Sequence, residues 1–287
     1  GVGSISWAIS SGSLPPGILL NSSTGVISGI PAVSGSYNFT VTASDTAGHS
    51  KSKSYNLTIY NQLVITNISL PNWTVNNSYN ININAVGGTG LYYYSMNSTN
   101  GLSVNSSTGN ITGTPLLPGT YVYTVTVVDS LGFSTTKNFN VIINDVPKIS
   151  TPDIVYMYTG DTPSLSLTVN NGTAPFTWTV LSGSITGLTI NNDGTFSGTP
   201  SLGDYNLNIK VTDSANVSDT KNITFKVIDP ITITTTPSGT NFYGIVNIPF
   251  RVTLNASGGI LPYSWSLSGS IPGLSLTSIA GQGILSG

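Results

Sequence analysis

Short stretches of this chain alternate between apolar and polar residues. Tyr37, Phe39 and Val41 occupy one face of the stretch 37–44, and the stretch 121–127 has the same alternation. A period of two predicts half-buried β-strands. Gly, Asn, Ser, Thr, Val, Ile and Tyr dominate the composition, which favours strands and turns and gives helices little support. We therefore expect an all-β protein.

One pattern organises the rest of the chain. Gly101–Pro115 reads G-L-S-V-N-S-S-T-G-N-I-T-G-T-P, and it recurs at Gly17–Pro31, in variant form at Gly187–Pro200, and in a degenerate copy at Gly273–Gly287. In each copy a short apolar stretch leads into a polar turn and a second apolar stretch leads out. Asn and Gly tolerate positive φ angles, so each copy predicts a β-hairpin with a tight turn.

The spacing of these hairpins gives the domain organisation. Their last glycines are separated by 84, 85 and 89 residues, a period that is the size of a small domain and too long for a solenoid repeat. Each complete period holds about seven strands, which predicts a tandem array of immunoglobulin-like β-sandwich domains. The predicted units, here named repeats 1 to 4, are residues 1–61, 62–145, 146–229 and 230–287.

Repeats 1 and 4 are expected to be partial domains. Repeat 1 lacks its first strands, equivalent to residues 63–85, and repeat 4 lacks its last strands, equivalent to residues 114–143. Either the chain is a window on a longer protein whose repeats continue head to tail, or neighbouring copies complete each other by strand donation. We favour the first explanation. The expected partners are thus further repeats of a longer parent chain or copies of the same chain.

Charge and composition exclude several function classes. Charged residues make up 6% of the chain, with ten Asp, no Glu and a net charge of −2, so binding to nucleic acid or an anionic membrane has no electrostatic basis. No apolar run is long enough for direct membrane insertion, and the absence of Cys excludes disulfides and thiolate metal sites. Few carboxylates are available for acid to protonate, which suggests a hot, acidic, archaeal surface habitat.

The order of three motifs points to a known family. The motifs P-Y-x-W-x-L, G-L-x-L-N-x-x-T-G-x-I-x-G-T-P and G-x-Y-x-F-x-V-x-x-x-D-x-x-G follow one another, and together they resemble the immunoglobulin-like repeats of the He-PIG type in bacterial and archaeal surface proteins. The resemblance covers essentially the whole chain. It implies an extracellular, cell-surface β-sandwich that acts as a spacer, stalk or adhesive module, without a catalytic motif. Tyr94 stands where Trp is usual, and repeat 3 has N-N-D-G in its turn.

The recurring aromatic residues are interpreted as structural. Four of them alternate in phase with aliphatic neighbours, which favours core anchors over platforms for sugars. These are Trp7, Tyr94, Trp178 and Trp265. Three others, each two residues after a Gly, are interpreted as tyrosine corners. These are Tyr37, Tyr121 and Tyr205.

The acidic residues and the histidine do not form a recognisable active site. Asp45, Asp129 and Asp213 recur at turns, where an Asp side chain caps backbone N–H groups, whereas calcium needs six or more oxygens. His49 stands alone, and no paired carboxylates are visible in the sequence. We therefore expect no enzyme activity, no catalytic or metal-binding residues and no cofactor.

The chemical signal that stands out is the N-x-S/T sequon, which marks acceptors for N-linked sugar. Several sequons sit on the outward phase of predicted strands, and Asn21 and Asn105 share one turn position. A usable acceptor must face solvent, so we predict that some of them carry glycans. The thirteen candidates are Asn21, Asn38, Asn56, Asn67, Asn72, Asn76, Asn97, Asn105, Asn110, Asn171, Asn216, Asn222 and Asn255.

These observations predict a structural extracellular protein, a glycosylated repeat segment of a surface filament, stalk or surface layer. One alternative is an adhesin or carbohydrate-binding module. That function would need exposed aromatic residues, for which Trp73, the stretch 92–94 and the pair 242–243 are the available material. Another alternative is a non-catalytic spacer of a large secreted hydrolase.

Overall fold

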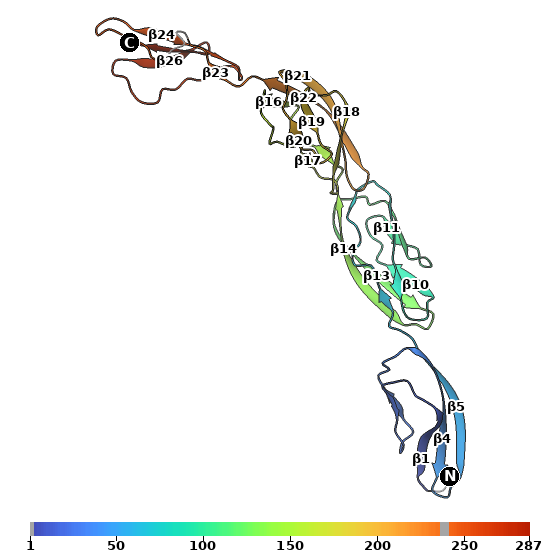
Figure 1. Cartoon of the computed structure of the whole chain (residues 1–287). Coiled ribbons are helices and arrows are strands. Elements are labelled where there is room, and N and C mark those ends of the chain that lie inside the picture. Colours follow the sequence, from blue (N-terminus) through green and yellow to red (C-terminus); the bar gives the residue numbers. More distant parts are fainter. Residues whose placement is uncertain (1–2, 236–240) are drawn as a thin grey trace. The chain divides into compact units, whose positions relative to one another are not determined.

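The protein consists of short and long β-strands joined by turns (Figure 1). The structure, a computed structural model, describes residues 3–235 and 241–287. Within these residues there is no helix, which confirms the prediction of an all-β chain. The chain divides into two compact units, Gly1–Ile143 and Asn144–Gly287, and each is described by itself.

In the first unit, repeat 1 contains one three-stranded sheet and one hairpin. The sheet has the order β1 (Ile5–Gly12), β4 (Gly35–Asp45), β5 (Ser50–Ile59), and the hairpin joins β2 (Ile18–Leu20) to β3 (Ile27–Gly29). The hairpin is the one that the repeated pattern predicts. Phe39 and Val41 of β4 are buried, whereas their polar neighbours face outward.

Repeat 2 completes this arrangement into a sandwich. One sheet has the order β10 (Tyr92–Met96), β13 (Gly119–Asp129), β14 (Ser134–Asn144), β7 (Trp73–Thr74). The other has the order β11 (Leu102–Val104), β12 (Asn110–Gly113), β8 (Tyr79–Asn82), and β6 (Val64–Ile65) pairs with β9 (Ala85–Val86). Residues from both sheets, such as Ile111 and Val125, are fully buried in one core.

In the second unit, repeat 3 has a core of the same kind. Its main sheet has the order β16 (Ile154–Tyr158), β22 (Ser218–Ile228), β21 (Gly203–Thr212), β18 (Thr177–Ser182). Two strand pairs accompany it, β15 (Lys148–Ile149) with β17 (Val169–Asn170), and β19 (Leu188–Ile190) with β20 (Phe196–Gly198). Trp178 of β18 is buried in the core, which confirms it as an anchor.

Repeat 4 has shorter sheets. β23 (Thr232–Ile233) pairs with β25 (Ala256–Ser257), and a three-stranded sheet has the order β24 (Arg251–Leu254), β27 (Gln282–Ser286), β26 (Ser275–Ile279). The expected strand around Trp265 is absent from the described residues. In the other repeats the anchor strand pairs with a long strand, and the described part of repeat 4 has no such strand beside Trp265.

In repeat 3, the alternation of Leu165, Leu167 and Val169 with polar residues predicts a strand. The strand expected at 165–169 is reduced to β17 and an isolated bridge between Ser166 and Thr195. Conversely, β16 was not predicted, because its residues I-V-Y-M-Y are apolar on both faces and show no alternation. This five-residue strand pairs in parallel with β22.

In repeats 1 to 3, a contact between an aromatic ring and a turn glycine holds the hairpin in place. A Cβ atom built on Gly109 would lie 2.7 Å from the Tyr94 ring, so only glycine leaves room for the ring. Gly25 has the same relation to Trp7, also at 2.7 Å. In repeat 2 the Tyr94 N–H also donates to the Ser106 carbonyl at 2.8 Å, which ties the turn to the anchor strand.

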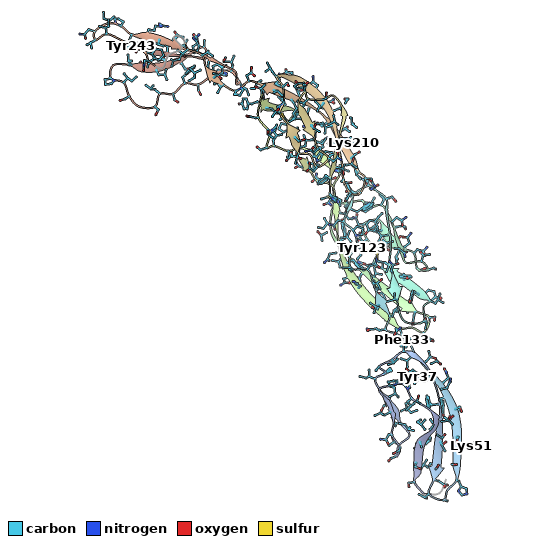
Figure 2. All side chains as sticks on the ribbon, viewed as in Figure 1. Tyr37, Lys51, Tyr123, Phe133, Lys210 and Tyr243 are labelled. Atoms are coloured by element: carbon cyan, nitrogen blue, oxygen red, sulfur yellow. The ribbon has the colours of Figure 1, made fainter. Side chains whose placement is uncertain are left out.

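The tyrosine corners are confirmed. The hydroxyls of Tyr37, Tyr121 and Tyr205 each donate to the backbone carbonyl four residues upstream, at 3.2, 3.1 and 3.1 Å. Each bond holds the chain where it enters a long strand. Tyr123 of repeat 2, labelled in Figure 2, differs, because its hydroxyl is buried and has no hydrogen-bond partner among the described residues. Burial raises the pKa of this phenol.

Replacing the turn glycine should destabilise repeat 2 by more than backbone strain alone. Gly109→Ala places a methyl group against Tyr94 at a φ of +74°, so we expect a loss of about 3 kcal/mol in the free energy of unfolding. Gly132→Ala is the control, because φ is +88° there but nothing lies within 4 Å of the new Cβ. It should cost only about 1 kcal/mol. Urea unfolding followed by tyrosine fluorescence measures both, and equal losses would contradict the contact.

The two neighbouring tyrosines of β13 should respond to loss of the hydroxyl with opposite signs. Tyr123→Phe removes an unsatisfied buried hydroxyl and should raise the free energy of unfolding by about 1 kcal/mol. Tyr121→Phe removes the corner hydrogen bond and should lower it by about 1 kcal/mol. Thermal unfolding of the two variants checks the prediction, which a destabilised Tyr123→Phe would contradict.

Candidate glycan acceptor sites

The turn asparagines of the organising hairpins present their amide nitrogens to solvent. In repeat 2, Asn105 Oδ1 accepts the backbone N–H groups of Ser107 and Thr108, both at 3.0 Å. Asn21 makes the same two bonds in repeat 1, also at 3.0 Å. Both residues are exposed. Because the oxygen is fixed toward the backbone, Nδ2, the atom that would carry a sugar, is directed away from it.

Three sequon asparagines lie on the outer faces of long strands, as the alternation predicts. Asn38 and Asn56 are opposite each other on β4 and β5, and Asn56 Nδ2 donates at 2.8 Å both to Asn38 Oδ1 and to Ser36 Oγ. A sugar on Asn56 would have to break one of these bonds, whereas Asn38 only accepts. Asn222 on β22 likewise accepts a bond, from Asn208 Nδ2 at 2.7 Å.

Two sequon asparagines use both ends of the amide to hold the backbone. Asn97 Nδ2 donates to the Val122 carbonyl at 2.9 Å, and its Oδ1 accepts the Thr124 N–H at 2.6 Å. Asn67 binds the backbone of residues 82 and 84 in the same way. These side-chain amides thus add hydrogen bonds to the backbone of neighbouring strands. They are the poorest acceptors of the set, a distinction that sequons alone do not reveal.

Six sequon asparagines remain. Three are exposed in turns, with φ between +58° and +64°, and these are Asn76, Asn171 and Asn216. The other three lie on or beside strands, where the first is exposed and the other two are half-buried, and these are Asn72, Asn110 and Asn255. All thirteen sequons thus have at least partial access to solvent, but only some have a free amide nitrogen.

The recurring aspartates are turn caps, as expected. Asp213 is buried, and its carboxylate accepts the backbone N–H groups of Thr173, Ala215 and Val217 at 2.9 to 3.0 Å. Asp129 makes the equivalent three bonds at 3.0 Å. In repeat 3 the bonds from Ala215 and Val217 close the local turn, and the bond from Thr173 fastens a distant loop to it.

The other candidate groups stay apart. His49 Nδ1 lies 3.4 Å from Asp45 Oδ2, as an exposed partner of a turn carboxylate. Within the described residues, no three His, Cys, Asp or Glu side chains come together in a way that could hold a metal ion. Trp73 packs against the core of repeat 2 and donates to the Asn77 carbonyl, so it does not offer an exposed platform.

Comparison with known proteins gives the family. The sequence matches the domain family described as "Putative Ig domain" (He_PIG) three times, over residues 2–60, 62–144 and 146–228. The chain belongs to the He-PIG family of immunoglobulin-like domains. This confirms both the resemblance seen in the motifs and the predicted fold class. A comparison with curated proteins gives no match for this He-PIG chain.

A comparison with solved structures finds several matches of low sequence identity and low TM-score to this He-PIG chain. A fragment of mouse cadherin-23 is 18% identical, covers 79% of this chain and 86% of its own, and has a TM-score of 0.31. An I-band fragment of titin is 16% identical, with coverages of 78% and 86% and a TM-score of 0.35. The human desmocollin-1 ectodomain is 13% identical, with coverages of 99% and 66% and a TM-score of 0.30.

The described residues contain no helix that is long and apolar enough to cross a membrane.

Removing a buried turn carboxylate should unfold the turn that it caps. Asp213→Ala leaves three backbone N–H groups without an acceptor, so we expect the free energy of unfolding to fall by about 3 kcal/mol. Asp161→Ala is the control at an exposed position and should change it by less than about 0.5 kcal/mol. Chemical unfolding of repeat 3, followed by Trp178 fluorescence, measures both. Equal effects would mean that Asp213 is not a structural cap.

Proposed function

We propose that this He-PIG chain is a glycosylated structural segment of a surface filament, stalk or surface layer outside the cell. The observation that carries the proposal is the shared geometry of Asn21 and Asn105. In two successive repeats the same turn holds an exposed sequon asparagine with its oxygen fixed and its nitrogen directed to solvent. A site repeated in this way suits a regular coat of sugar along a repetitive chain.

The outer faces of the long strands support the same function. They carry hydroxyls and amides bonded across strands, such as Thr42 to Ser52 at 2.7 Å and Thr126 to Thr136 at 3.0 Å. Such a face is well hydrated, nearly uncharged and without a pronounced electrostatic attraction for a partner. A spacer needs these properties, whereas an adhesive surface is usually richer in exposed aromatic side chains.

The adhesin alternative needs exposed aromatic side chains, and only some of its candidates are exposed. Tyr92 and Tyr94 pack against the core, as does Trp73, so three of its candidate aromatic residues are not available for a ligand. Tyr93 remains exposed, as do Phe242 and Tyr243 of repeat 4, and Tyr243 is labelled in Figure 2. A non-catalytic spacer of a secreted hydrolase would use the same fold, so the fold alone does not separate that alternative from a filament segment. The acidic, archaeal habitat also stays a prediction.

The proposal includes head-to-tail contact between repeats. In repeat 2, where β8 pairs with β12, Ile111 and Phe139 are 0% and 2% exposed. The equivalent residues of repeat 1, Ile27 and Tyr55, are 38% and 45% exposed. We propose that strands equivalent to β8 from another repeat, in the parent chain or in a neighbouring copy, cover this face.

Site-resolved mass spectrometry of the native protein tests the glycan proposal. We expect sugar on Asn21, Asn105 and Asn38, and little or none on Asn67 and Asn97, because their amide nitrogens already donate to backbone carbonyls. Asn191, at the equivalent turn position of repeat 3, is a natural control, because N-N-D is not a sequon. An intact mass equal to that of the bare polypeptide would refute the proposal.

A further inference from the structure

Strand β16 lies at an edge of the main sheet of repeat 3 (Figure 1). Its neighbour on one side is β22, with which it pairs in parallel. The Asp153 carbonyl accepts the Thr224 N–H at 2.8 Å, and the Thr159 N–H donates to the Ile228 carbonyl at 3.0 Å. Backbone groups of alternate residues point to opposite sides of a strand. Those of Ile154, Tyr156 and Tyr158 therefore point away from β22.

The same three residues also carry exposed apolar side chains. Ile154, Tyr156 and Tyr158 are 46%, 46% and 41% exposed, whereas Met157 is buried and Val155 packs against the core. The same three residues of β16 thus combine backbone N–H and C=O groups that point away from β22 with large, exposed apolar side chains. This row of residues is a template on which another strand can form.

Two of the other main-sheet edges, β18 and β7, are protected in ways that β16 is not. β18, the opposite edge of the same sheet, carries a bulge between Val180 and Ser182. β7, the corresponding edge in repeat 2, is only two residues long. Bulges and short strands both discourage pairing at an edge. β16 has five residues, and none of them is proline, glycine or charged.

The charges beside β16 are neutralised within the chain. Lys226, opposite Tyr156 on β22, forms an ion pair with Asp204 at 2.7 Å, and this bond raises the pKa of the lysine. Asp153, just before the strand, pairs with Lys221 at 2.8 Å. A second strand that approaches this edge therefore finds both Lys226 and Asp153 already neutralised by a partner.

We propose that β16 pairs antiparallel with β16 of a second copy, about a two-fold axis at Tyr156. Tyr156 then lies opposite its own copy, and Ile154 lies opposite Tyr158. All three pairs are of the hydrogen-bonded type, because their backbone groups face the partner. The aromatic and aliphatic side chains meet in cross-strand pairs on one face. The contact is self-complementary and closes after two copies.

A second copy fits this edge better than a polysaccharide does. A sugar could stack on the tyrosine rings but would leave a regular row of backbone groups unused. A two-fold contact brings residue i of one copy to residue j of the other and the reverse, and here the pairs Tyr156–Tyr156 and Ile154–Tyr158 join large side chains. β16 contains no sequon, so the contact does not depend on the proposed glycans.

The contact is small, so it should be weak between free molecules and effective between chains held side by side. A covalent trap is the suitable test. The chain has no cysteine, so Tyr156→Cys in the full chain introduces a single thiol on the two-fold axis. In a hydrogen-bonded antiparallel pair the Cα atoms are about 5.5 Å apart, within reach of a disulfide.

Under mild oxidation we expect Tyr156→Cys to form a covalent dimer on a non-reducing gel. Leu181→Cys, on the bulged edge β18 and 50% exposed, is the matched control and should stay mainly monomeric. Circular dichroism confirms that both variants are folded. A dimer yield from Tyr156→Cys that is no higher than that from Leu181→Cys would overturn the proposal.

A second measurement needs no cysteine. In sedimentation equilibrium, the dimer fraction of the unmodified chain should rise with concentration, and Tyr156→Lys should weaken the association at least tenfold by placing two cations opposite each other. Leu181→Lys should leave it unchanged. A dissociation constant above about 1 mM would overturn the pairing. The pairing would also be overturned if the chain stayed monomeric and bound a soluble polysaccharide, and if Tyr156→Lys abolished that binding.

Discussion

The architecture depends on a ring lying on a glycine. The anchor side chain, Tyr94 in repeat 2, occupies the space that any Cβ at the hairpin turn would need. The ring belongs to one sheet and the turn connects two strands of the other, so this single contact sets the distance between the two layers. Ile111, Val125 and their neighbours then fill the core between two sheets whose separation the ring and the glycine have set. The position of the turn asparagine follows from the same contact.

Two carboxylates support the turns from inside these domains. The Asp129 and Asp213 carboxylates are buried and satisfy several backbone N–H groups each, so the long turns are rigid without a helix, a disulfide or a metal. The outer faces instead rely on hydroxyls and amides. A chain with 6% charged residues can thus still place a charge wherever a turn needs an acceptor.

The sequence predicted the features that depend on local pattern. The hairpins, the tyrosine corner at Tyr121 and the cap at Asp213 follow from spacing and turn chemistry. β16 was missed because a strand that is apolar on both faces has no alternation to detect. The quality of Asn97 as an acceptor could not be predicted, because its amide is held by backbone atoms of Val122 and Thr124, far along the chain.

The parallel ladder of β16 and β22 has a mechanical consequence. The chain enters this ladder at Ile154, beside Thr224, and leaves it at Ile228, beside Tyr158, so entry and exit lie at opposite ends. Tension along the chain would load all of these hydrogen bonds in shear at the same time. In repeat 2 the corresponding strand, β7, has only two residues and would share the load among far fewer bonds. A stretched array would therefore yield at repeat 2 before repeat 3.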